Sequence, residues 1–512
     1  MSWQFTRQAR QRLEREDGAI VKDWGGRLPI ALIYPNSYHI GMSNLGFQTI
    51  YGLLNAQDDI LCERVFWEPP DRPVSVESAR PLAHFSVLAF SVSYEMDYFN
   101  VLQVLRAAGV PLLAQEREEG HPLVIAGGPC LTANPVPLSA FVDAVAIGEA
   151  EVILPPFLDV LRRGPGAPRH EILEALADVP GLWVPALDGG RRVVRQHAPD
   201  LDAFATTSVV LTPDTELGDM FLMEVARGCA RGCRFCLAGY HFRPQRVRSL
   251  DTLLRHAEVG LAHRQRLGLV GASVSDHPEI GELATRLRAR GALVSVSSLR
   301  VDSLPQGLLQ ALAESKTRTV TVAPEAGTES LRRRIGKPAS TEVILDAVRR
   351  VGEMGFPELK LYFLVGLPGE TDDDIRELAR LLRQCKDTIE QVRSGTRIVA
   401  NINPCVPKAG TPFQGAAMAT PEVLAERLRL AKSLLAKSGV AIRGEGAQWS
   451  LIQGLLARGD ARMGQALARL EGNTAAAWLK ALEPVDTSWL HRELAPSEWP
   501  WAFLESGVRQ TP

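Results

Sequence analysis

The sequence predicts an α/β protein in which a doubly wound parallel sheet is followed by a partial (β/α)6 barrel and a C-terminal helical region. Two series of short apolar strands alternate with helical segments, the first over about residues 28–163 and the second over about 216–414. Beyond residue 415 the pattern is helical, most clearly over 423–435. Strands that alternate with helices favour parallel sheets. A chain of 512 residues is also too long for one core, so several domains are expected.

The first series carries small residues after its predicted strands. Strands are expected at 29–34, 87–91, 122–126 and 143–147, and helices at 46–54 and 99–108. Gly109 closes the second helix, because glycine readily takes the left-handed conformation that ends a helix. Ser, Gly or Asn follows the strand ends, and doubly wound sheets bind ligands at the carboxyl ends of their strands. The sequence therefore predicts a ligand site along this edge, where small residues let a bulky ligand approach the backbone.

The second series predicts a barrel of six strands rather than eight. Its apolar strands are expected at 221–226, 267–271, 292–297, 319–323, 359–365 and 397–403. Residues 164–215 are rich in Pro, Gly, Asp and Arg, which indicates a linker. The expected organisation is an N-terminal arm (1–27), a first α/β domain (28–163), the linker (164–215), the barrel (216–414) and the helical region (415–512).

The composition indicates neither a nucleic-acid nor a membrane partner. The 57 basic and 59 acidic residues give a formal net charge of -2, which does not favour nucleic-acid binding. No stretch approaches the ~20 apolar residues needed to cross a bilayer. The first residues carry charges but no apolar run, so no secretory signal is expected. Together with few cysteines, seven in all, this predicts a protein of the reducing cytoplasm.

Three cysteines lie close together directly after the predicted strand at 221–226: Cys229, Cys233 and Cys236. Three thiolates can hold three corners of a [4Fe-4S] cluster and leave the fourth iron open to a non-protein ligand. A zinc site would need a fourth side chain close by, and His241 is the nearest candidate. The spacing favours the cluster, and zinc remains the alternative.

This Cys-x3-Cys-x2-Cys spacing resembles the signature of radical S-adenosylmethionine (SAM) enzymes, in which the open iron chelates the amino acid end of SAM. Segments after the later strands are similar to further motifs of the family, in the expected order. The resemblance implies adenine contacts from Phe235, Gly366 and Pro368, a ribose contact from Glu325, and contacts to the methionine end from Ser297, Arg300 and Ser273. The family often has Gly-Gly-Glu after the second strand, where this chain offers Ser273 or Asp276.

Several of these residues also have an ordinary structural interpretation. Glu325 is suited to the start of a helix, where a carboxylate meets the positive end of the dipole. His241 and His277 flank the proposed SAM loops, and a structural histidine with satisfied hydrogen bonds explains each of them. The run 332–334 of three arginines is expected to be a solvated face.

The first α/β domain resembles the Rossmann-like cobalamin-binding domain that precedes this barrel in cobalamin-dependent radical SAM enzymes. The whole chain is most similar to an uncharacterised group of such proteins. The likeness is carried by residues 34–47, 91–94, 126–129 and 148–149. It implies cobalamin contacts from Tyr38, Gly41, Ser43, Asn44, Ser91, Ser93, Gly127, Gly128, Gly148 and Glu149. A tight turn is an alternative explanation of the pair Gly127 and Gly128.

The lower face of the cobalamin is expected to meet backbone or apolar side chains. Many cobalamin folds carry Asp-x-His-x-x-Gly, whose imidazole binds cobalt. With His39 aligned, Ser37 replaces the aspartate and Met42 the glycine. The carboxylate that orients a ligating histidine is therefore missing from the motif.

The function that the resemblance implies is that of a cobalamin-dependent radical SAM enzyme. Such an enzyme uses the [4Fe-4S] cluster to cleave SAM to a 5′-deoxyadenosyl radical, here for methylation of an unactivated carbon. Its electron donor would be a low-potential flavodoxin or ferredoxin. The alternatives are a radical methylthiotransferase acting on RNA or protein, and a non-catalytic cobalamin or redox sensor. The substrate and the catalytic residues cannot be read from the sequence.

Overall fold

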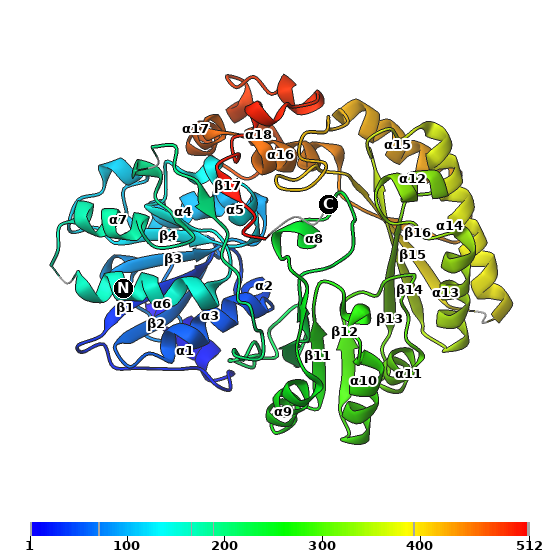
Figure 1. The fold of residues 1–512 in the computed structure, drawn as a ribbon, viewed down its shortest axis with the longest axis horizontal. Coiled ribbons are helices and arrows are strands. Elements are labelled where there is room, and N and C mark those ends of the chain that lie inside the picture. The colour runs from blue at the N-terminus through cyan, green and yellow to red at the C-terminus, as the bar shows by residue number, and fades with distance from the viewer. Residues whose placement is uncertain (1–2, 70–71, 165, 188, 393–394, 509–512) are drawn as a thin grey trace. The chain divides into compact units, whose positions relative to one another are not determined.

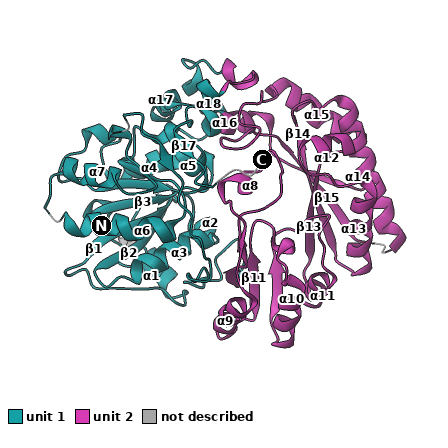
Figure 2. Ribbon diagram, viewed as in Figure 1, with its two compact units in different colours: residues 1–220, 455–487, 496–512 teal, residues 221–454, 488–495 magenta. Residues whose placement is uncertain are grey.

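The computed structural model describes residues 1–512 except 1–2, 70–71, 165, 188, 393–394 and 509–512. The chain forms two compact units (Figure 2). Unit 1 comprises residues 1–220, 455–487 and 496–512, and unit 2 comprises residues 221–454 and 488–495. No helix in the described part of the chain has the length and apolar character needed to cross a membrane.

Unit 1 is built on a six-stranded sheet whose strand order is that of a doubly wound fold (Figure 1). The order is β2-β1-β3-β4-β5-β6, and all neighbours are parallel except β5 and β6. The chain leaves β1 for β2 on one side and continues with β3 on the other, so the switch point lies between β1 and β3. The strands are β1 (Leu28–Tyr34), β2 (Ile60–Phe66), β3 (Val87–Ser91), β4 (Leu123–Gly127), β5 (Ala144–Ala146) and β6 (Leu182–Trp183).

The helices of unit 1 begin and end where the sequence provides capping groups. The Asn44 side chain accepts the N–H of Phe47 at the start of α3, and Gly109 ends α4 with φ 71°. Side chains of α3 and α6 pack with β1, β2 and β4 into one apolar core. The helices are α1 (Trp3–Leu13), α2 (Tyr38–Gly41), α3 (Leu45–Asn55), α4 (Tyr98–Ala108), α5 (Pro129–Ala133), α6 (Ala150–Arg163) and α7 (Arg169–Ala177).

Residues 164–215, expected to be a linker, belong to unit 1. They contain α7 and β6, and Leu182 and Val184 are buried in the same core as α3 and α6. A short strand, β7 (Val193–Val194), pairs with β17 (Leu504–Glu505) near the C-terminus. This segment has the composition of a loop but contains a few apolar residues. Their burial stabilises its packing against the rest of unit 1.

The region after residue 415 is divided between the two units. Helices α17 (Ala461–Arg469) and α18 (Ala475–Leu482) belong to unit 1, where Asn134 donates to the carbonyls of Ala457 and Gly459. Helix α15 (Pro421–Leu434) and strand β16 (Ala441–Arg443) belong to unit 2. The expected single helical region thus contributes to both cores.

Unit 2 is an open parallel barrel. Strands β8 (Phe221–Glu224), β11 (Arg266–Val270) and β12 (Leu293–Val296) form one part, and β13 (Thr319–Glu325), β14 (Glu358–Val365) and β15 (Arg397–Pro404) form the other. A bridge between Leu299 and Val322 joins the two parts. The six predicted strands are present, and β16 adds a short parallel strand beside β15. β16 is too short to stand out from the helical pattern around it.

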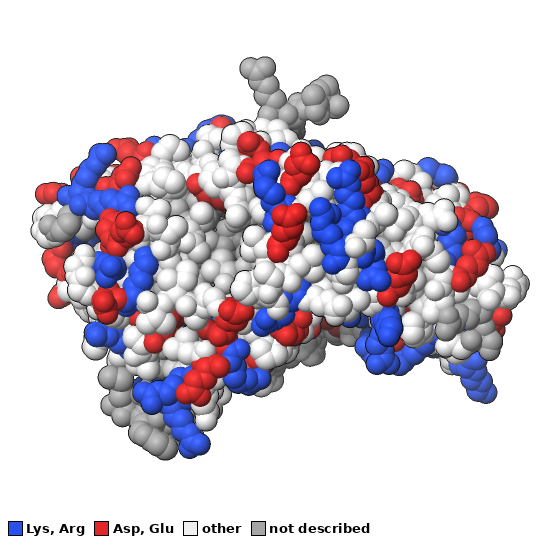
Figure 3. All heavy atoms as spheres, turned by 90° about the horizontal axis from the view of Figure 1, so that it is seen from below, with Lys and Arg blue, Asp and Glu red and all other residues white. Residues whose placement is uncertain are grey.

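Helices follow the barrel strands and cover them, and serines and threonines cap several of them. Ser249, Ser340 and Thr420 accept backbone N–H groups at the starts of α9, α13 and α15. The helices are α9 (Leu250–Leu261), α10 (Ile280–Ala289), α11 (Gln306–Glu314), α12 (Glu329–Arg334), α13 (Thr341–Glu353) and α14 (Asp372–Val392). In the space-filling view of Figure 3, basic and acidic side chains are interspersed over the face shown.

Candidate functional site

The three clustered cysteines lie on one loop at the carboxyl end of β8. This cysteine loop (residues 228–237) follows the short strand β9 (Ala226–Arg227) and precedes helix α8 (Ala238–His241). β9 pairs with the antiparallel strand β10 (Arg246–Val247), which anchors the base of the loop. All three thiols are free; Cys229 and Cys233 are 9% and 7% exposed, and Cys236 is partly exposed.

Cys233 and Cys229 lie close enough to Cys236 to act on its ionisation. Burial raises the pKa of Cys236. The nearby Cys233 and Cys229 raise this pKa further, and hydrogen bonds from backbone N–H groups lower it in part. The three thiols therefore share one electrostatic environment. Among the described residues, no three His, Cys, Asp or Glu side chains converge closely enough for one ion. Nε2 of His241 lies 2.8 Å from the carbonyl oxygen of Ala409.

Two glycines let the cysteine loop pack closely on its neighbours. Gly228 has φ 79°, and a Cβ there would lie 2.1 Å from the carbonyl oxygen of Phe242. Gly336, just after α12, has φ 75°, and its Cβ would lie 2.1 Å from the carbonyl oxygen of Gly232. Arg234 also donates its N–H to the carbonyl of Ile335 at 2.8 Å. The turn after α12 thus supports the loop that carries Cys233.

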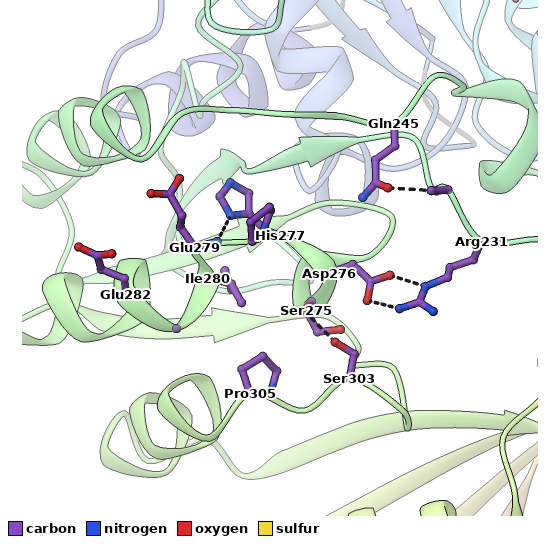
Figure 4. Close-up of a pocket in the computed structure, with 13 residues that line it drawn as sticks. Arg231, Gln245, Ser275, Asp276, His277, Glu279, Ile280, Glu282, Ser303 and Pro305 are labelled. Carbon is purple, nitrogen blue, oxygen red and sulfur yellow. Dashed lines mark hydrogen bonds and ion pairs between the residues drawn. The ribbon is translucent and has the colours of Figure 1, made fainter.

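The second and third strand ends are tied to the cysteine loop by a charge network (Figure 4). Arg231 makes two 2.9 Å contacts with Asp276, and Ser273 donates to the same carboxylate. Arg300 makes two contacts of 2.8 and 2.9 Å with Asp302. Burial raises the pKa of Asp276, but the hydrogen bonds from Arg231 and Ser273 outweigh burial and leave it below its ordinary value. Of the residues predicted at these ends, Ser273 is buried and Arg300 partly buried, whereas Ser297 is exposed.

A pocket of about 710 Å³ opens beside this network in unit 2. Figure 4 shows Arg231 and Asp276 on one side of it and the start of α10, with Glu279 and Glu282, on the other. His277 is 2% exposed; its Nε2 meets the carbonyl of Arg248 at 2.9 Å and its Nδ1 accepts the N–H of Glu279. This histidine is therefore a structural one with both ring nitrogens engaged.

The fourth strand end holds Glu325 in an unusual conformation and in an ion pair. The register of β13 on β14 shifts between Val322 and Glu325, and Glu325 has φ 71°. Its Oε1 lies 2.9 Å from Nζ of Lys337, and the two side chains are 12% and 8% exposed. Glu325 is thus a residue of the strand end and not the start of a helix.

Arg332 supports the turn that follows Glu325. Its guanidinium is fully buried and donates to the carbonyls of Ala326, Gly327 and Ala339. The run of three arginines expected to be a solvated face is therefore divided, with Arg333 exposed and Arg332 inside. A guanidinium has five donors, which suits it to bind several carbonyls of one turn.

The fifth strand end forms a tight turn held by a buried carboxylate. Gly366 has φ 79°, and its Cβ would lie 2.5 Å from the side chain of Leu424. Its N–H donates to Glu370 at 2.6 Å, and Arg427 contacts the same carboxylate at 2.9 Å. Burial raises the pKa of Glu370 to about 7, against the effect of these two partners. Pro368 lies on the same turn and is partly exposed.

An apolar cluster joins the cysteine loop to the later strand ends. Phe235 packs against it, and its buried members are Ala326, Leu331, Ile335, Leu367, Cys405 and Phe413. These residues come from the segments after β13, β14 and β15. The structure thus brings Phe235, Glu325, Gly366 and Pro368 to one end of the barrel.

In unit 1, polar side chains meet at the switch point between β1 and β3. Asn44 donates to the hydroxyl of Ser93 at 3.0 Å. Burial raises the pKa of the Tyr34 hydroxyl, and its hydrogen bonds with Ser93 and Asn44 act against that shift. Beside them Asn36 donates to the buried Asp97 at 2.8 Å. We call Tyr34, Asn36, Asn44, Ser93 and Asp97 the switch-point cluster.

Ser91, Gly127 and Gly128 end the neighbouring strands β3 and β4. Ser91 is 9% exposed, and both glycines are partly buried. Gly128 has φ 128°, and a Cβ there would lie 2.1 Å from the carbonyl oxygen of Val92. This close approach is sufficient to require glycine, as the tight-turn interpretation expects.

Four other residues of the expected cobalamin site are in contact with other parts of the protein. Tyr38 is 1% exposed and its hydroxyl donates to Glu16, while a Cβ on Gly41 would meet the ring of Phe66 at 2.4 Å. A Cβ on Gly148 would lie 2.2 Å from the carbonyl oxygen of Gln196, and the Glu149 carboxylate accepts the N–H of Ala198. The small and polar residues at these positions pack against residues 196–198 and against the N-terminal segment. The sequence pattern does not reveal these contacts.

His39 and Ser43 lie against residues 214–216. His39 Nδ1 is 3.1 Å from Oδ1 of Asp214, and the two side chains are 48% and 42% exposed. The hydroxyl of Ser43 donates to the carbonyl of His39 and accepts the N–H of Glu216. A carboxylate thus accompanies His39, although the residues around it in the sequence supply none.

Comparison with known proteins places these features in a family. The family described as "Radical SAM superfamily" matches residues 223–382, and "Radical SAM proteins, N-terminal" matches residues 46–185. The uncharacterized protein MJ0966 of Methanocaldococcus jannaschii is 31% identical over 444 residues, which are 86% of this chain and 90% of that protein. The chain belongs to the radical SAM family, and it is a relative of MJ0966 over most of the length of both proteins.

More distant relatives match this radical SAM protein only in part. A tRNA-2-methylthio-N(6)-dimethylallyladenosine synthase of Ruegeria sp. is 23% identical over 48% of this chain and 57% of that protein. The ribosomal protein uS12 methylthiotransferase RimO of Salinispora tropica is 29% identical over 48% of this chain and 49% of its own length. The chain spans about half of each of these proteins.

Two solved structures share the fold of this radical SAM protein over most of its length. The methyltransferase TsrM from Kitasatospora setae, solved with cobalamin and a [4Fe-4S] cluster, has a TM-score of 0.55 at 12% identity and is covered completely, with 90% of this chain aligned. OxsB, a cobalamin-dependent SAM radical enzyme solved with aqua-cobalamin and SAM, has a TM-score of 0.54 at 12% identity, with 90% of this chain and 71% of OxsB aligned. The predicted fold class is confirmed.

Sequence reasoning missed three side chains of the candidate sites. Lys337 gave no signal of its own, and Arg332 was expected to lie on a solvated face with the rest of the run 332–334. Asp214 lies far from His39 in the chain and within residues expected to be a linker. Only the folded structure brings these partners together.

Proposed function

We propose that this radical SAM protein is a cobalamin-dependent enzyme that holds a [4Fe-4S] cluster on Cys229, Cys233 and Cys236. The observation that carries the proposal is the position of three free thiols on one loop at the carboxyl end of β8, beside the ends of the other barrel strands. When bound, the cluster supplies one electron for cleavage of SAM, and cobalamin supplies a methyl group. Methylation of an unactivated carbon is the reaction we propose.

The residues of the barrel end have distinct roles in this proposal. Glu325, held by Lys337, offers a carboxylate oxygen to the ribose hydroxyls of SAM. Arg300 attracts the carboxylate of the methionine part, and its present partner Asp302 restrains it until SAM arrives. Phe235 and the Gly366 turn form an apolar wall for the adenine. These groups bind and orient SAM and keep water from the reacting carbon.

Unit 1 offers the switch-point cluster as the place for cobalamin. Asn44 and Ser93 present amide and hydroxyl groups at the carboxyl ends of β1 and β3, where doubly wound sheets bind their ligands. Ser91 and Gly127 extend this edge along β3 and β4, whereas Gly128 is already required by the close approach of Val92. The fold shared with TsrM and OxsB, both solved with a cobalamin bound, supports this placement. Tyr38, Gly41, Gly148 and Glu149 are used by the protein itself and are left out of the proposed site.

The test is anaerobic reconstitution with iron, sulfide and hydroxocobalamin, followed by metal and product analysis. We expect about four iron atoms and one corrinoid per chain, and 5′-deoxyadenosine after SAM and a low-potential reductant such as flavodoxin or ferredoxin are added. Cys233→Ala removes a cluster ligand and is expected to lose the iron and the product. Cys385→Ala removes a buried thiol of α14 and serves as the matched control.

The same experiment separates the alternatives. Protein that binds zinc in place of iron would overturn the proposal. About eight iron atoms per chain would indicate a second cluster and favour a methylthiotransferase. An intact cluster that never yields 5′-deoxyadenosine would indicate a sensor. Reconstituted protein that never retains a corrinoid would remove the cobalamin part of the proposal and leave the SAM chemistry.

A further inference from the structure

Two segments of unit 2 contain basic residues and no acidic ones. Residues 228–250, which begin with the cysteine loop, contain five arginines and no Asp or Glu. Residues 330–341, which include most of α12 and the turn after it, contain three arginines and one lysine, again without Asp or Glu. The whole chain has 57 basic and 59 acidic residues, so this excess of positive charge is local.

The two segments are in contact at the loop that carries Cys233. The N–H of Arg234 donates to the carbonyl of Ile335 at 2.8 Å. Gly336 comes so close to Gly232 that a Cβ on it would lie 2.1 Å from the carbonyl oxygen of Gly232. The exposed side chains of the cysteine loop and of the end of α12 therefore belong to one region of the surface.

Most other charges of the two segments are neutralised or buried. Arg231, Arg248 and Lys337 form ion pairs with carboxylates of neighbouring segments. Arg332 is buried and donates to backbone carbonyls. These residues serve the structure of the barrel end and do not offer a free charge to a partner protein.

Three exposed arginines remain, and we call Arg234, Arg333 and Arg334 the basic patch. Neither Arg234 nor Arg334 forms an ion pair within the described residues, and Arg334 donates to the carbonyl of Gly369 at 2.7 Å. Arg333 is 64% exposed and lies 3.6 Å from Glu329, an exposed pair that water screens. The positive charge of the two segments is therefore presented to solvent at this patch.

The basic patch lies beside the proposed cluster. Arg234 follows Cys233 directly in the chain, and Gly232 precedes it. Cys233 is 7% exposed, whereas Gly232 and Arg234 are both exposed. A cluster bound to Cys233 would thus have little protein between it and solvent at this loop. Electron transfer between proteins slows steeply as the distance between the redox centres grows, so a donor has to dock at such a place.

We infer that the basic patch is the docking surface for the electron donor, a small acidic protein with a low-potential flavin or iron–sulfur centre. The inference rests on the proposed function. Carboxylates of the donor would meet the guanidiniums of the patch, and such complementary charges speed the encounter and fix the orientation of the partners. The donor loses one electron, and the cluster is reduced from [4Fe-4S]²⁺ to [4Fe-4S]⁺. That electron then breaks the C5′–S bond of SAM, which yields methionine and the 5′-deoxyadenosyl radical and returns the cluster to its oxidised state.

Nucleic acid is the other polyanion that arginines attract, and the patch favours a protein. Nucleic-acid binding depends on the neutralisation of many phosphates, and three arginines neutralise few of them. The net charge of -2 adds no long-range attraction for a nucleic acid. An acidic redox protein needs only a small charged area close to the cluster.

Docking is tested by anaerobic calorimetry of oxidised flavodoxin, an acidic donor, with the reconstituted protein. We expect the Kd to rise about tenfold between about 50 and 300 mM NaCl, because salt screens exposed charges. The patch variant, Arg234→Glu with Arg333→Glu, should raise the Kd at low salt by about tenfold or more, because like charges then face each other.

The matched control is Arg376→Glu with Arg380→Glu on α14. These arginines are 55% and 65% exposed and pair with carboxylates of their own helix, as Arg333 does. The control variant has the same change in net charge as the patch variant. It is expected to leave the flavodoxin Kd within about twofold of that of the unmodified protein, because surface charges further apart than about 10 Å are screened.

Reduction by two donors separates docking from the chemistry that follows. The patch variant should form 5′-deoxyadenosine slowly with limiting reduced flavodoxin and recover as the flavodoxin concentration is raised. With reduced methyl viologen, a small cation that needs no docking surface, it should form 5′-deoxyadenosine at the rate of the unmodified protein. The iron content should be the same in the unmodified protein and in both variants.

The outcomes distinguish this inference from the proposed function. A flavodoxin Kd that responds neither to salt nor to the patch variant overturns the inference, as does an equal effect of the control variant. Binding of a tRNA mixture that the patch variant abolishes, without binding of flavodoxin, assigns the patch to RNA and also overturns it. If the patch variant loses iron, the salt dependence of the unmodified protein still decides. Reconstituted protein that forms no 5′-deoxyadenosine even with viologen refutes the proposed function, and with it this inference.

Discussion

Replacement of Gly336 by alanine tests whether the turn after α12 supports the cysteine loop. Gly336 has φ 75°, and a Cβ would lie 2.1 Å from the carbonyl oxygen of Gly232 and 3.4 Å from Cα of Cys233. Gly291, in the same unit, has φ 82° and no atom within 4 Å of its Cβ position. The two glycines thus share a left-handed backbone and differ in what a methyl group meets.

The magnitudes follow from these two environments. A left-handed alanine costs about 1–2 kcal/mol, and this cost applies to both variants. At Gly336 the methyl group must also displace a backbone, and overpacking of this kind costs a further 1–3 kcal/mol or so. We therefore expect Gly336→Ala to lower the free energy of unfolding by about 2–5 kcal/mol and Gly291→Ala by about 1–2 kcal/mol. Both variants should remain folded, because domains of this kind have about 5–15 kcal/mol of stability.

The decisive measurement is the iron content after anaerobic reconstitution, with denaturant unfolding of the same preparations as the measure of stability. Displacement of the loop at Cys233 moves one thiol relative to the other two, so Gly336→Ala is expected to retain much less iron than Gly291→Ala. Equal iron content in the two variants, at their different stabilities, would refute the idea that the turn after α12 positions the cluster ligands.

Two further predictions concern buried charges. Burial raises the pKa of Asp97 from 3.8 to about 6, although the hydrogen bond from Asn36 acts in the opposite direction. The native protein therefore disfavours the charged form, and the free energy of unfolding falls as the pH rises from about 4 to 6. Asp97→Asn should raise the free energy of unfolding by up to about 3 kcal/mol at pH 7.5 and have no effect near pH 3. Urea unfolding at the two pH values measures this difference. An equal effect at both pH values would contradict the raised pKa of Asp97 as its cause. Lys337→Met removes the partner of Glu325 and should raise the SAM concentration for half-maximal 5′-deoxyadenosine formation about tenfold with unchanged iron content. Lys386→Met removes a partly exposed lysine that pairs with Glu390 on α14, and it should leave both quantities unchanged. Equal effects of the two lysine variants would refute the role of Lys337.

The proposed cluster site consists of residues that are close together in the sequence. Cys229, Cys233 and Cys236 lie on one loop, as their spacing predicts. The strand-end residues Glu325 and Gly366 were also recognisable, because parallel strands bring their carboxyl ends to one edge of a barrel regardless of loop details. The doubly wound sheet was predictable for the same reason, since the period of the apolar residues reveals strands and helices locally.

The residues expected to contact cobalamin were harder to choose from the sequence, because small residues have several uses. Gly41 and Gly148 lie where a ligand could approach, yet they admit the ring of Phe66 and the backbone of Gln196. A glycine in the sequence indicates that something comes close and does not say whether it is a ligand or the protein. Likewise, the polar composition of residues 164–215 concealed the few apolar side chains that bind this segment to unit 1.

The sequence by itself determined the fold class, the loop that carries the three thiols and the order of the strand-end motifs, because each depends on neighbours along the chain. The tertiary structure alone decided which charges meet: Lys337 with Glu325, Arg231 with Asp276, and Asp214 with His39. Such pairs are formed by groups that the packing of separate segments brings within a few ångströms, and electrostatic and hydrogen-bonding interactions act strongly only over that range.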